Sequence, residues 1–262
     1  MDKILNKMGI KSTINPSLTV YEKYSNVHII NPYKPESLVM KSVSLTRASS
    51  QYLTVSPNAA LELNPVSVVC WFKRSTTTNL MYISAYEPKG ANNDGRGWIM
   101  QSSSAGNDSF LWGDGDGSFA SVTGDATDTN WNCIVWTFNG TTGELFENNV
   151  SKGSVNDGIT YTNGGGTNPN AKAFYIGTFN NFGVGNYFDG LITGFAIFNV
   201  ALNSYQRDWI YNSGQLRNYA KADFYSNCVM YLPFNDSYDD YTGNGRNATA
   251  VNSPTFDSTI PQ

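Results

Sequence analysis

The segment from residue 174 to residue 214 constrains the fold more than any other part of this 262-residue chain. Between residues 190 and 199, apolar residues occupy both alternating sets of positions, and turn residues bound the run. This pattern indicates an inner strand that is buried on both faces. Asn203 and Gln206 then form a helix-capping pattern, and Gly214 is a natural stop. The segment therefore predicts one short helix in a chain built mainly from strands.

The same segment resembles the closing module of laminin-G-like, concanavalin A-type jelly rolls. Its parts follow the family's order: an Ile-Gly strand end at 176–177, a Phe-Asp-Gly turn at 188–190, the apolar strand, an Ala-Leu step at 201–202 and the helix. The resemblance implies an all-β fold. We expect an antiparallel two-sheet jelly-roll sandwich of the concanavalin A-like type, with one short helix and an extended N-terminal arm.

Two further stretches carry the resemblance through the chain. Residues 66–73 are similar to the family's signature strand, with Trp71 in the place of its inward tryptophan. Residues 131–150 are similar to its central hairpin, and their strong strand pattern predicts that Trp131 and Trp136 lie in the core.

The domain organisation is predicted from composition. Residues 1–44 contain prolines that interrupt regular structure, and they are predicted to form an extended docking arm. Residues 45–262 alternate strands with turn clusters and are predicted to form the sandwich. Residues 228–257 resemble an element that normally opens such domains. They are predicted to complete the same sandwich, and the alternative is a truncated repeat.

Charge and cysteine content limit the classes of partner and the cell compartment that the sequence is consistent with. The net charge is −4 and the basic residues do not cluster beyond the pair Lys73-Arg74, which argues against nucleic acid. Cys70, Cys133 and Cys228 lie in apolar runs and are predicted to be buried free thiols. The sequence lacks a signal-peptide pattern and a long apolar run. We therefore expect the protein to assemble in the cytoplasm of the cell that produces it, without conventional secretion and without membrane contact.

The sequence contains no close match to the catalytic motifs expected for this fold. The glucanases of this fold carry a strand with closely spaced carboxylates, and the nearest counterpart here is Glu144 with Glu147. A spacing of three puts these side chains on opposite faces of a strand, so both are interpreted as solvent-facing charges. The single histidine, His28, lies in the arm, so the predicted sandwich has no histidine for a Ser-His-Asp catalytic triad. We therefore expect no enzymatic activity.

Calcium is a candidate ligand because jelly rolls of this family often hold it in loops. Asp114 and Asp116, with Asp125, form the densest group of carboxylates, although Asp-Gly pairs are also common hairpin turns. A second acidic group is interpreted as turn capping; it comprises Asp236, Asp239, Asp240 and Asn244.

A sugar site requires an aromatic platform beside polar groups. Trp98 and Trp112 have glycine neighbours and are predicted to be exposed at strand ends. Polar loop residues that could contact a glycan stand near them in the sequence: Asn93, Asp94 and Arg96.

The preferred functional hypothesis is a non-catalytic virion structural or capsid decoration protein, because domains resembling this one occur in phage structural proteins. It would be a homo-oligomer anchored to other virion proteins of the capsid or tail through residues 1–44. The alternative is a glycan-binding adhesin for host attachment, and a polysaccharide-degrading glucanase is the third hypothesis.

Overall fold

The computed structural model describes residues 20–23, 26–29, 39–56, 58–61, 63–78, 80–86, 97–103, 107–113, 119–156, 174–179 and 186–262. The chain divides into two units, residues 1–38 and residues 39–262. In the first unit, β1 (Val20–Lys23) and β2 (Asn26–Ile29) form an antiparallel pair. The second unit starts ahead of the predicted boundary at residue 45, because β3 already begins at Ser42.

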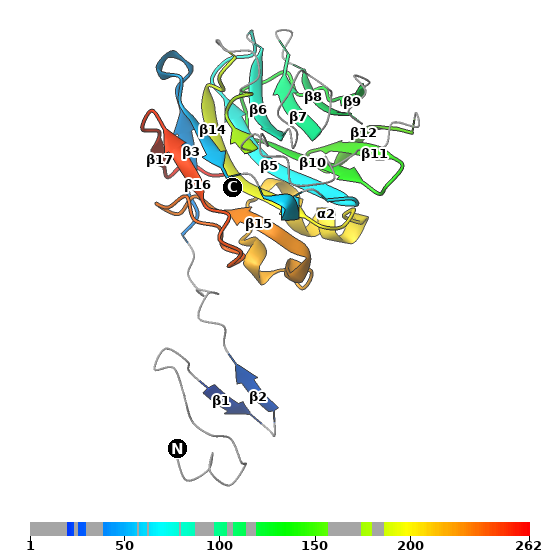
Figure 1. The fold of residues 1–262 in the computed structure, drawn as a ribbon, viewed down its shortest axis with the longest axis vertical. Helices are drawn as coiled ribbons and strands as arrows, with labels where there is room; N and C mark the ends of the chain where they lie inside the picture. Colours follow the sequence, from blue (N-terminus) through cyan, green and yellow to red (C-terminus); the bar gives the residue numbers. More distant parts are fainter. Residues whose placement is uncertain are drawn as a thin grey trace. The chain divides into compact units, whose positions relative to one another are not determined.

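The second unit is a sandwich of two antiparallel sheets (Figure 1). The eight-stranded sheet consists, in spatial order, of β12 (Val150–Val155), β11 (Gly143–Glu147), β10 (Asn132–Phe138), β5 (Val66–Arg74), β14 (Gly190–Phe198), β3 (Ser42–Leu45) and β17 (Thr255–Asp257), with β15 (Cys228–Leu232) also paired to β14. The seven-stranded sheet consists of β16 (Ala248–Val251), β4 (Tyr52–Val55), β13 (Phe174–Ile176), β6 (Met81–Tyr86), β7 (Gly97–Ser102), β8 (Asp108–Gly113) and β9 (Phe119–Thr123). This architecture confirms the predicted jelly-roll sandwich.

The hydrophobic core fills the space between the sheets. Its centre is aromatic: Trp136 of β10 stacks on Phe110 of β8, with ring centroids 4.2 Å apart, and Phe110 also stacks on Trp98. Alternation along each strand directs one set of side chains into this core and the other set outward. Trp136 is fully buried, as the sequence pattern predicted, whereas Trp131 is only partly buried because it precedes β10.

The C-terminal segment contributes a strand to each sheet edge on one side of the sandwich. Strand β16 pairs with β4 at the edge of the seven-stranded sheet, and β17 pairs with β3 at the edge of the eight-stranded sheet. Strand β15 pairs with the second half of β14, beyond the part that pairs with β3. Residues 228–257 are thus part of the same two sheets.

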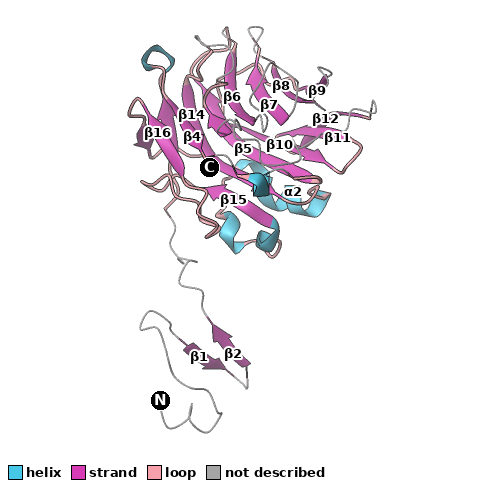
Figure 2. Cartoon of the chain, in the orientation of Figure 1, coloured by secondary structure: helices cyan, strands magenta, loops and turns pink. Residues whose placement is uncertain are grey.

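Residues 204–227 form one α-helix and short 3-10 helices, which lie beside the eight-stranded sheet (Figure 2). Helix α2 (Ser204–Tyr211) begins with the predicted capping box, in which Asn203 Oδ1 accepts from Gln206 N. It ends at Asn212, which adopts the left-handed conformation, and not at the predicted Gly214. The 3-10 helices of the sandwich are η2 (Arg47–Ser49), η3 (Ala59–Leu61), η4 (Asn212–Gly214), η5 (Tyr219–Lys221) and η6 (Tyr225–Asn227).

Helix α2 and the 3-10 helices that follow it, η4 to η6, cover the outer face of the eight-stranded sheet around Trp71. Trp71 of β5 stacks on Tyr211 with ring centroids 5.9 Å apart, and its Nε1 donates to the Tyr219 hydroxyl at 3.0 Å. Trp71 is therefore buried, as predicted, but it points toward the helices and not into the space between the sheets.

The three cysteines are free and buried, which confirms the prediction from their apolar neighbours. Burial raises the pKa of the Cys133 thiol well above its ordinary value, so this sulfur is held in its unreactive neutral form. In the part of the chain that the structure describes, no helix is long and apolar enough to cross a membrane.

Candidate ligand-binding face

The outer surface of the seven-stranded sheet is the candidate site, and we call it the tyrosine face. Strand pairing places one row of side chains across it, because paired residues share a face. The row and its neighbours on this face are Thr249, Val251, Tyr52, Thr54, Tyr175, Tyr82, Ala85, Ile99, Gln101, Ser109, Leu111, Phe119, Ser121 and Thr123.

Three tyrosines gather at one end of the tyrosine face. The ring of Tyr52 lies 6.2 Å from that of Tyr175 and 6.0 Å from that of Tyr187, between centroids, and the Tyr52 and Tyr187 rings are nearly parallel. Tyr52 and Tyr187 are partly exposed. Tyr175 is buried at 9% exposure, so Tyr52 and Tyr187 form the accessible part of the cluster. Their aromatic surface is rigid, because a packed tyrosine has few rotatable bonds to order on binding.

Main-chain hydrogen bonds position Tyr187, which lies outside any strand. Asn186 O accepts from Tyr82 N at 3.0 Å, and Phe188 N donates to Gly177 O at 2.8 Å. The neighbouring Phe188 is fully buried in the core, so the chain alternates here as it does in a strand. This alternation leaves the Tyr187 ring on the outer side, beside Tyr52.

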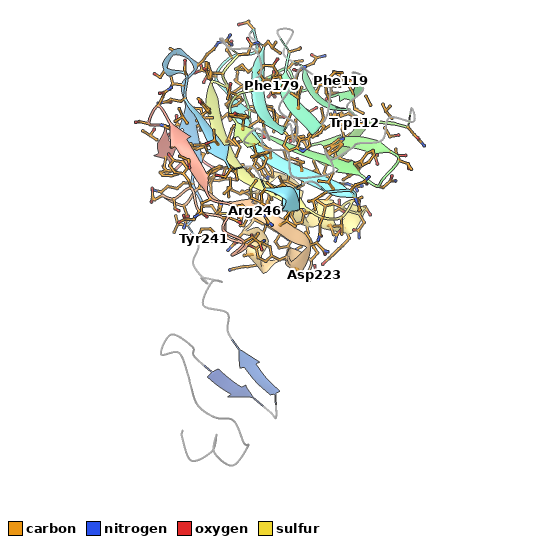
Figure 3. All side chains as sticks on the ribbon, in the orientation of Figure 1. Trp112, Phe119, Phe179, Asp223, Tyr241 and Arg246 are labelled. Carbon is orange, nitrogen blue, oxygen red and sulfur yellow. The ribbon has the colours of Figure 1, made fainter. Side chains whose placement is uncertain are left out.

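A second aromatic pair extends the surface along β6. The rings of Tyr82 and Phe179 lie 5.3 Å apart between centroids, and both side chains are partly exposed. At the far edge, Phe119 of β9 is 49% exposed. Figure 3 labels Phe119 and Phe179 in the region of β6 to β9, away from Asp223 in the helical region. Aromatic side chains therefore occur at both ends of the face.

The electrostatics of this face are those of neutral groups. Every side chain that the described strand pairings place on it is an uncharged one. Burial and then the neighbouring phenols of Tyr187 and Tyr175 raise the pKa of Tyr52 above its ordinary value. Tyr52 is therefore neutral at physiological pH. The hydroxyl group of a neutral tyrosine both donates and accepts hydrogen bonds.

The predicted exposure of Trp98 and Trp112 is wrong. These residues are 2% and 1% exposed, and they pair with each other across β7 and β8 on the inner face of the sheet. Their glycine neighbours Gly97 and Gly113 suggested exposure, but they pair on the opposite, outer face. Neither indole ring offers a surface to solvent. The other predicted glycan contacts lie outside the described residues: Asn93, Asp94 and Arg96.

The predicted calcium ligands Asp114 and Asp116 also lie outside the described residues. Asp125 is described, and it forms an ion pair with Lys152. Its hydrogen bond with Lys152 lowers the pKa of the Asp125 carboxyl. In the described ranges, acidic, cysteine and histidine side chains form no group of three or more that could hold a metal ion.

The second acidic cluster organises a turn. Asp240 is buried, and its Oδ1 accepts from Tyr231 N at 3.1 Å and from Thr242 N at 3.0 Å. Its Oδ2 accepts from Arg246 N at 3.1 Å. These bonds agree with the interpretation of the cluster as turn capping.

The buried carboxylates are bound within the protein. Glu144 and Glu147 lie on opposite faces of β11, but Glu147 is 3% exposed, so its predicted contact with solvent is wrong. Its Oε2 accepts from Asp125 N at 2.9 Å, and burial raises the pKa of its carboxyl. Asp108 is buried against Arg74, with 3.1 Å between Oδ1 and Nη1.

Sequence reasoning missed the tyrosine face, although the signal is present. Tyr52, Tyr82 and Tyr175 each stand next to a buried aliphatic or aromatic residue in a short strand. That alternation marks an outward position in a strand, although Tyr175 in β13 is itself buried. Only the fold brings the three strands together, because β4, β13 and β6 are neighbours in the sheet but distant in the sequence.

Solved structures share this fold. A candidate carbohydrate binding protein from Bacteroides ovatus is 16% identical, with a TM-score of 0.62, and the match covers 86% of this chain and 62% of that one. The chain thus spans about three fifths of that protein's length. A heptameric pentraxin from Limulus polyphemus is 12% identical, with a TM-score of 0.58, and the match covers 85% of this chain and 97% of the pentraxin.

Comparison of sequences gives the family directly. No curated protein matches the chain in sequence. A family model described as the concanavalin A-like lectin/glucanases superfamily matches residues 47–206, which is more than half of the chain. The match, together with the two-sheet jelly roll, confirms the resemblance identified in the sequence. The chain belongs to the concanavalin A-like lectin/glucanases superfamily.

Proposed function

We propose that this chain is a non-catalytic glycan-binding module that binds sugars on the tyrosine face. The observation that carries the proposal is the group of three neighbouring tyrosine rings on an uncharged sheet surface. The likeness in fold to a candidate carbohydrate binding protein is consistent with it. Binding to a neutral polar molecule also fits the low content of charged residues, 15% of the chain.

The chemistry of sugars suits such a surface. A pyranose ring has one apolar face of C–H groups, which packs on an aromatic ring, and hydroxyl groups around its edge. Tyr52 and Tyr187 supply the ring surface, and their phenol groups can exchange hydrogen bonds with the sugar hydroxyls. Thr54 and Gln101 lie on the same face and add further polar groups.

A glycan array screened with the full chain tests the proposal. Tyr52→Ala and Tyr187→Ala are each expected to weaken binding by about tenfold or more, the equivalent of about 1.4 kcal/mol. The matched control is Tyr205→Ala, because Tyr205 is 57% exposed but lies on helix α2, beside the other sheet. Equal loss in all three variants, or no glycan bound by the wild type, would contradict the proposal.

A second candidate function is a structural or decoration role in a virus particle, with the tyrosine face turned toward the host. The observation that favours it is the separate N-terminal unit, in which β1 pairs only with β2 among the described strands. A two-stranded hairpin is marginally stable by itself. A capsid or tail protein that adds a strand to this hairpin would stabilise it and anchor the chain.

The anchoring role is tested by deletion of residues 1–38. Purified particles that carry the full chain are expected to lose it in the shortened form, as measured by mass spectrometry. Circular dichroism of the shortened chain must show an intact sandwich. Sedimentation of both forms tests the expected homo-oligomer. Retention of the shortened, folded chain on particles would refute anchoring through this unit.

A further inference from the structure

Residues 39–41 begin the sandwich unit and lead into β3, and we call them the root segment. Lys41 holds this segment at two points. Its main-chain oxygen accepts from the Thr193 hydroxyl at 2.6 Å, and its ammonium group pairs with Asp236 at 2.7 Å. The Asp236 side chain is 63% exposed, so solvent screens this ion pair and its contribution is small. The hydrogen bonds to buried groups therefore matter most for the position of the root segment.

The middle residue of the root segment, Met40, contacts a buried tyrosine. Met40 Sδ accepts a hydrogen bond from the Tyr231 hydroxyl at 3.4 Å. Tyr231 is fully buried, and its ring lies 4.9 Å from that of Tyr219 between centroids. Its hydroxyl oxygen also accepts from Tyr219 N at 3.4 Å. A hydroxyl group has one hydrogen, and here the packed tyrosine directs that hydrogen to the Met40 sulfur.

Met40 differs in accessibility from the other described methionines. Met40 is partly exposed, whereas Met81, Met100 and Met230 are each 0% exposed. Oxidation of a thioether requires that the oxidant reach the sulfur atom. Among the methionines that the structure describes, Met40 is thus the one that a dissolved oxidant can reach while the sandwich stays folded.

A peroxide oxidises such a sulfur in one two-electron step. The sulfur attacks one oxygen of hydrogen peroxide, so that an S–O bond forms and the O–O bond breaks. The proton on the transferred oxygen passes to the departing hydroxide, which leaves as water. The sulfur loses two electrons and the peroxide gains them. The product, methionine sulfoxide, is polar, and methionine sulfoxide reductases convert it back to the thioether.

The sulfoxide does not fit the contact that the thioether makes. The Met40 sulfur and the Tyr231 hydroxyl oxygen are 3.4 Å apart. A hydrogen bond between two oxygens takes about 2.7 Å by itself, so the new oxygen has no room between these two atoms. Tyr231 is fixed by its buried packing, so the Met40 side chain has to move toward water, which the polar sulfoxide favours.

We propose that Met40 is a reversible oxidation site for peroxides, and that formation of its sulfoxide releases the root segment from the sandwich. The two sheets stay intact, because Met40 precedes β3 and pairs with no strand of the described sheets. This inference is independent of the proposed function. It predicts that the backbone at Lys41 becomes accessible under oxidising conditions and is protected again after reduction.

The experiment treats the folded full chain with hydrogen peroxide and follows each methionine by peptide mapping with mass spectrometry. Limited digestion with trypsin then measures opening at two sites. Cleavage after Lys41 reports release of the root segment, because Thr193 otherwise holds the Lys41 main chain. Cleavage after Arg74, which is 1% exposed in β5, reports unfolding of the whole sandwich.

We expect Met40 to be oxidised about tenfold faster than Met81, Met100 and Met230. Oxidation is expected to raise cleavage after Lys41 by about tenfold and to leave cleavage after Arg74 unchanged. Treatment with methionine sulfoxide reductases and dithiothreitol restores the protection. Met40→Leu removes the response to peroxide. Met81→Leu is the matched control that keeps the response, because it alters a buried methionine of β6.

Four outcomes would overturn the inference. Oxidation of Met40 no faster than that of the buried methionines would show that its sulfur is not an accessible site. Complete oxidation of Met40 without a change at Lys41 would show that the sulfoxide stays in place. An equal rise in cleavage after Lys41 and after Arg74 would mean that peroxide unfolds the whole sandwich. A Met40→Leu protein that responds like the wild type would place the oxidised group elsewhere.

Discussion

Both sheets of this sandwich carry aromatic side chains on their outer faces, but these side chains are covered on one sheet and partly exposed on the other. On the eight-stranded sheet, Trp71 is covered by Tyr211 and Tyr219 and is 1% exposed. On the seven-stranded sheet, Tyr52 and Tyr187 stack on each other and remain partly exposed. The covered face stabilises the fold through buried area, and the open face keeps its aromatic surface available to a ligand.

The largest difference between the faces is expected for Trp71→Ala. Loss of a buried indole and of its hydrogen bond to Tyr219 should lower the free energy of unfolding by about 3–5 kcal/mol. Tyr187→Ala on the open face should lower it by about 1 kcal/mol or less. Chemical denaturation of both variants measures the contrast, and equal losses would remove the distinction between a structural face and a binding face.

The covered face should also be intolerant of added volume. Gly194 has a φ of +54°, and a Cβ there would lie 2.7 Å from Leu216 Cδ1 and 3.1 Å from the Tyr219 hydroxyl. Gly194→Ala is expected to cost about 2 kcal/mol or more, as backbone strain and a clash combine. Gly245→Ala is the matched control, because Gly245 has a φ of +71° and nothing lies within 4 Å of its added Cβ. Similar losses of stability in the two variants would mean that the helices pack loosely on the outer face of the eight-stranded sheet.

A smaller effect is expected from the cap of the covering helix. Asn203→Ala removes the acceptor for Gln206 N and should destabilise the protein by about 1 kcal/mol. Asn203→Asp keeps an acceptor at this position and should retain most of the stability. Thermal denaturation checks both variants. An unchanged Asn203→Ala protein would show that packing on the sheet, and not the cap, holds helix α2.

The smallest expected effect concerns tyrosine ionisation at alkaline pH. Burial raises the pKa of Tyr219 well above its ordinary value, and burial with neighbouring phenols raises that of Tyr52. A phenol with a raised pKa in the folded state contributes stability below pH 10.0, and this contribution is lost as the pH rises through the folded value.

NMR titration of ¹³C-labelled tyrosine checks this expectation. Tyr52 should ionise above pH 10.0 while the protein is folded. Tyr187→Phe should shift the pKa of Tyr52 back toward its ordinary value, because the electrostatic contribution of the Tyr187 phenol group is removed. Tyr219 should remain neutral until the protein unfolds. Ionisation of Tyr219 before the protein unfolds would indicate that the helices open away from the eight-stranded sheet.

Local patterns in the sequence predicted much of the fold. The double-sided apolar run of β14 and the cap formed by Asn203 and Gln206 depend on neighbouring residues, so they could be recognised without the rest of the chain. The extent of helix α2 was less accurate, because Asn212 adopted the left-handed conformation before Gly214 was reached. A terminating residue of either type satisfies the same backbone requirement.

The candidate site could not be predicted in the same way. Trp98 and Trp112 have glycine neighbours, but which side of a strand faces the core depends on its pairing with other strands. Tyr52, Tyr175 and Tyr187 come from distant parts of the sequence and meet only in the folded sheet. The sequence position of Glu147 in a hairpin suggested an exposed side chain. In the structure the side chain is buried, and its carboxylate accepts a hydrogen bond from the main-chain N–H of Asp125.

The two strands contributed by the C-terminal segment have a consequence for synthesis. Strand β3 starts at Ser42 but receives its partner β17 only at residues 255–257, and β4 receives β16 only at residues 248–251. Both sheets therefore keep an unpaired edge while most of the chain leaves the ribosome, and exposed edges are sites of aggregation. The sandwich closes only when β16 and β17 have been translated, so a mutation that weakens these strands would act on the final step of folding.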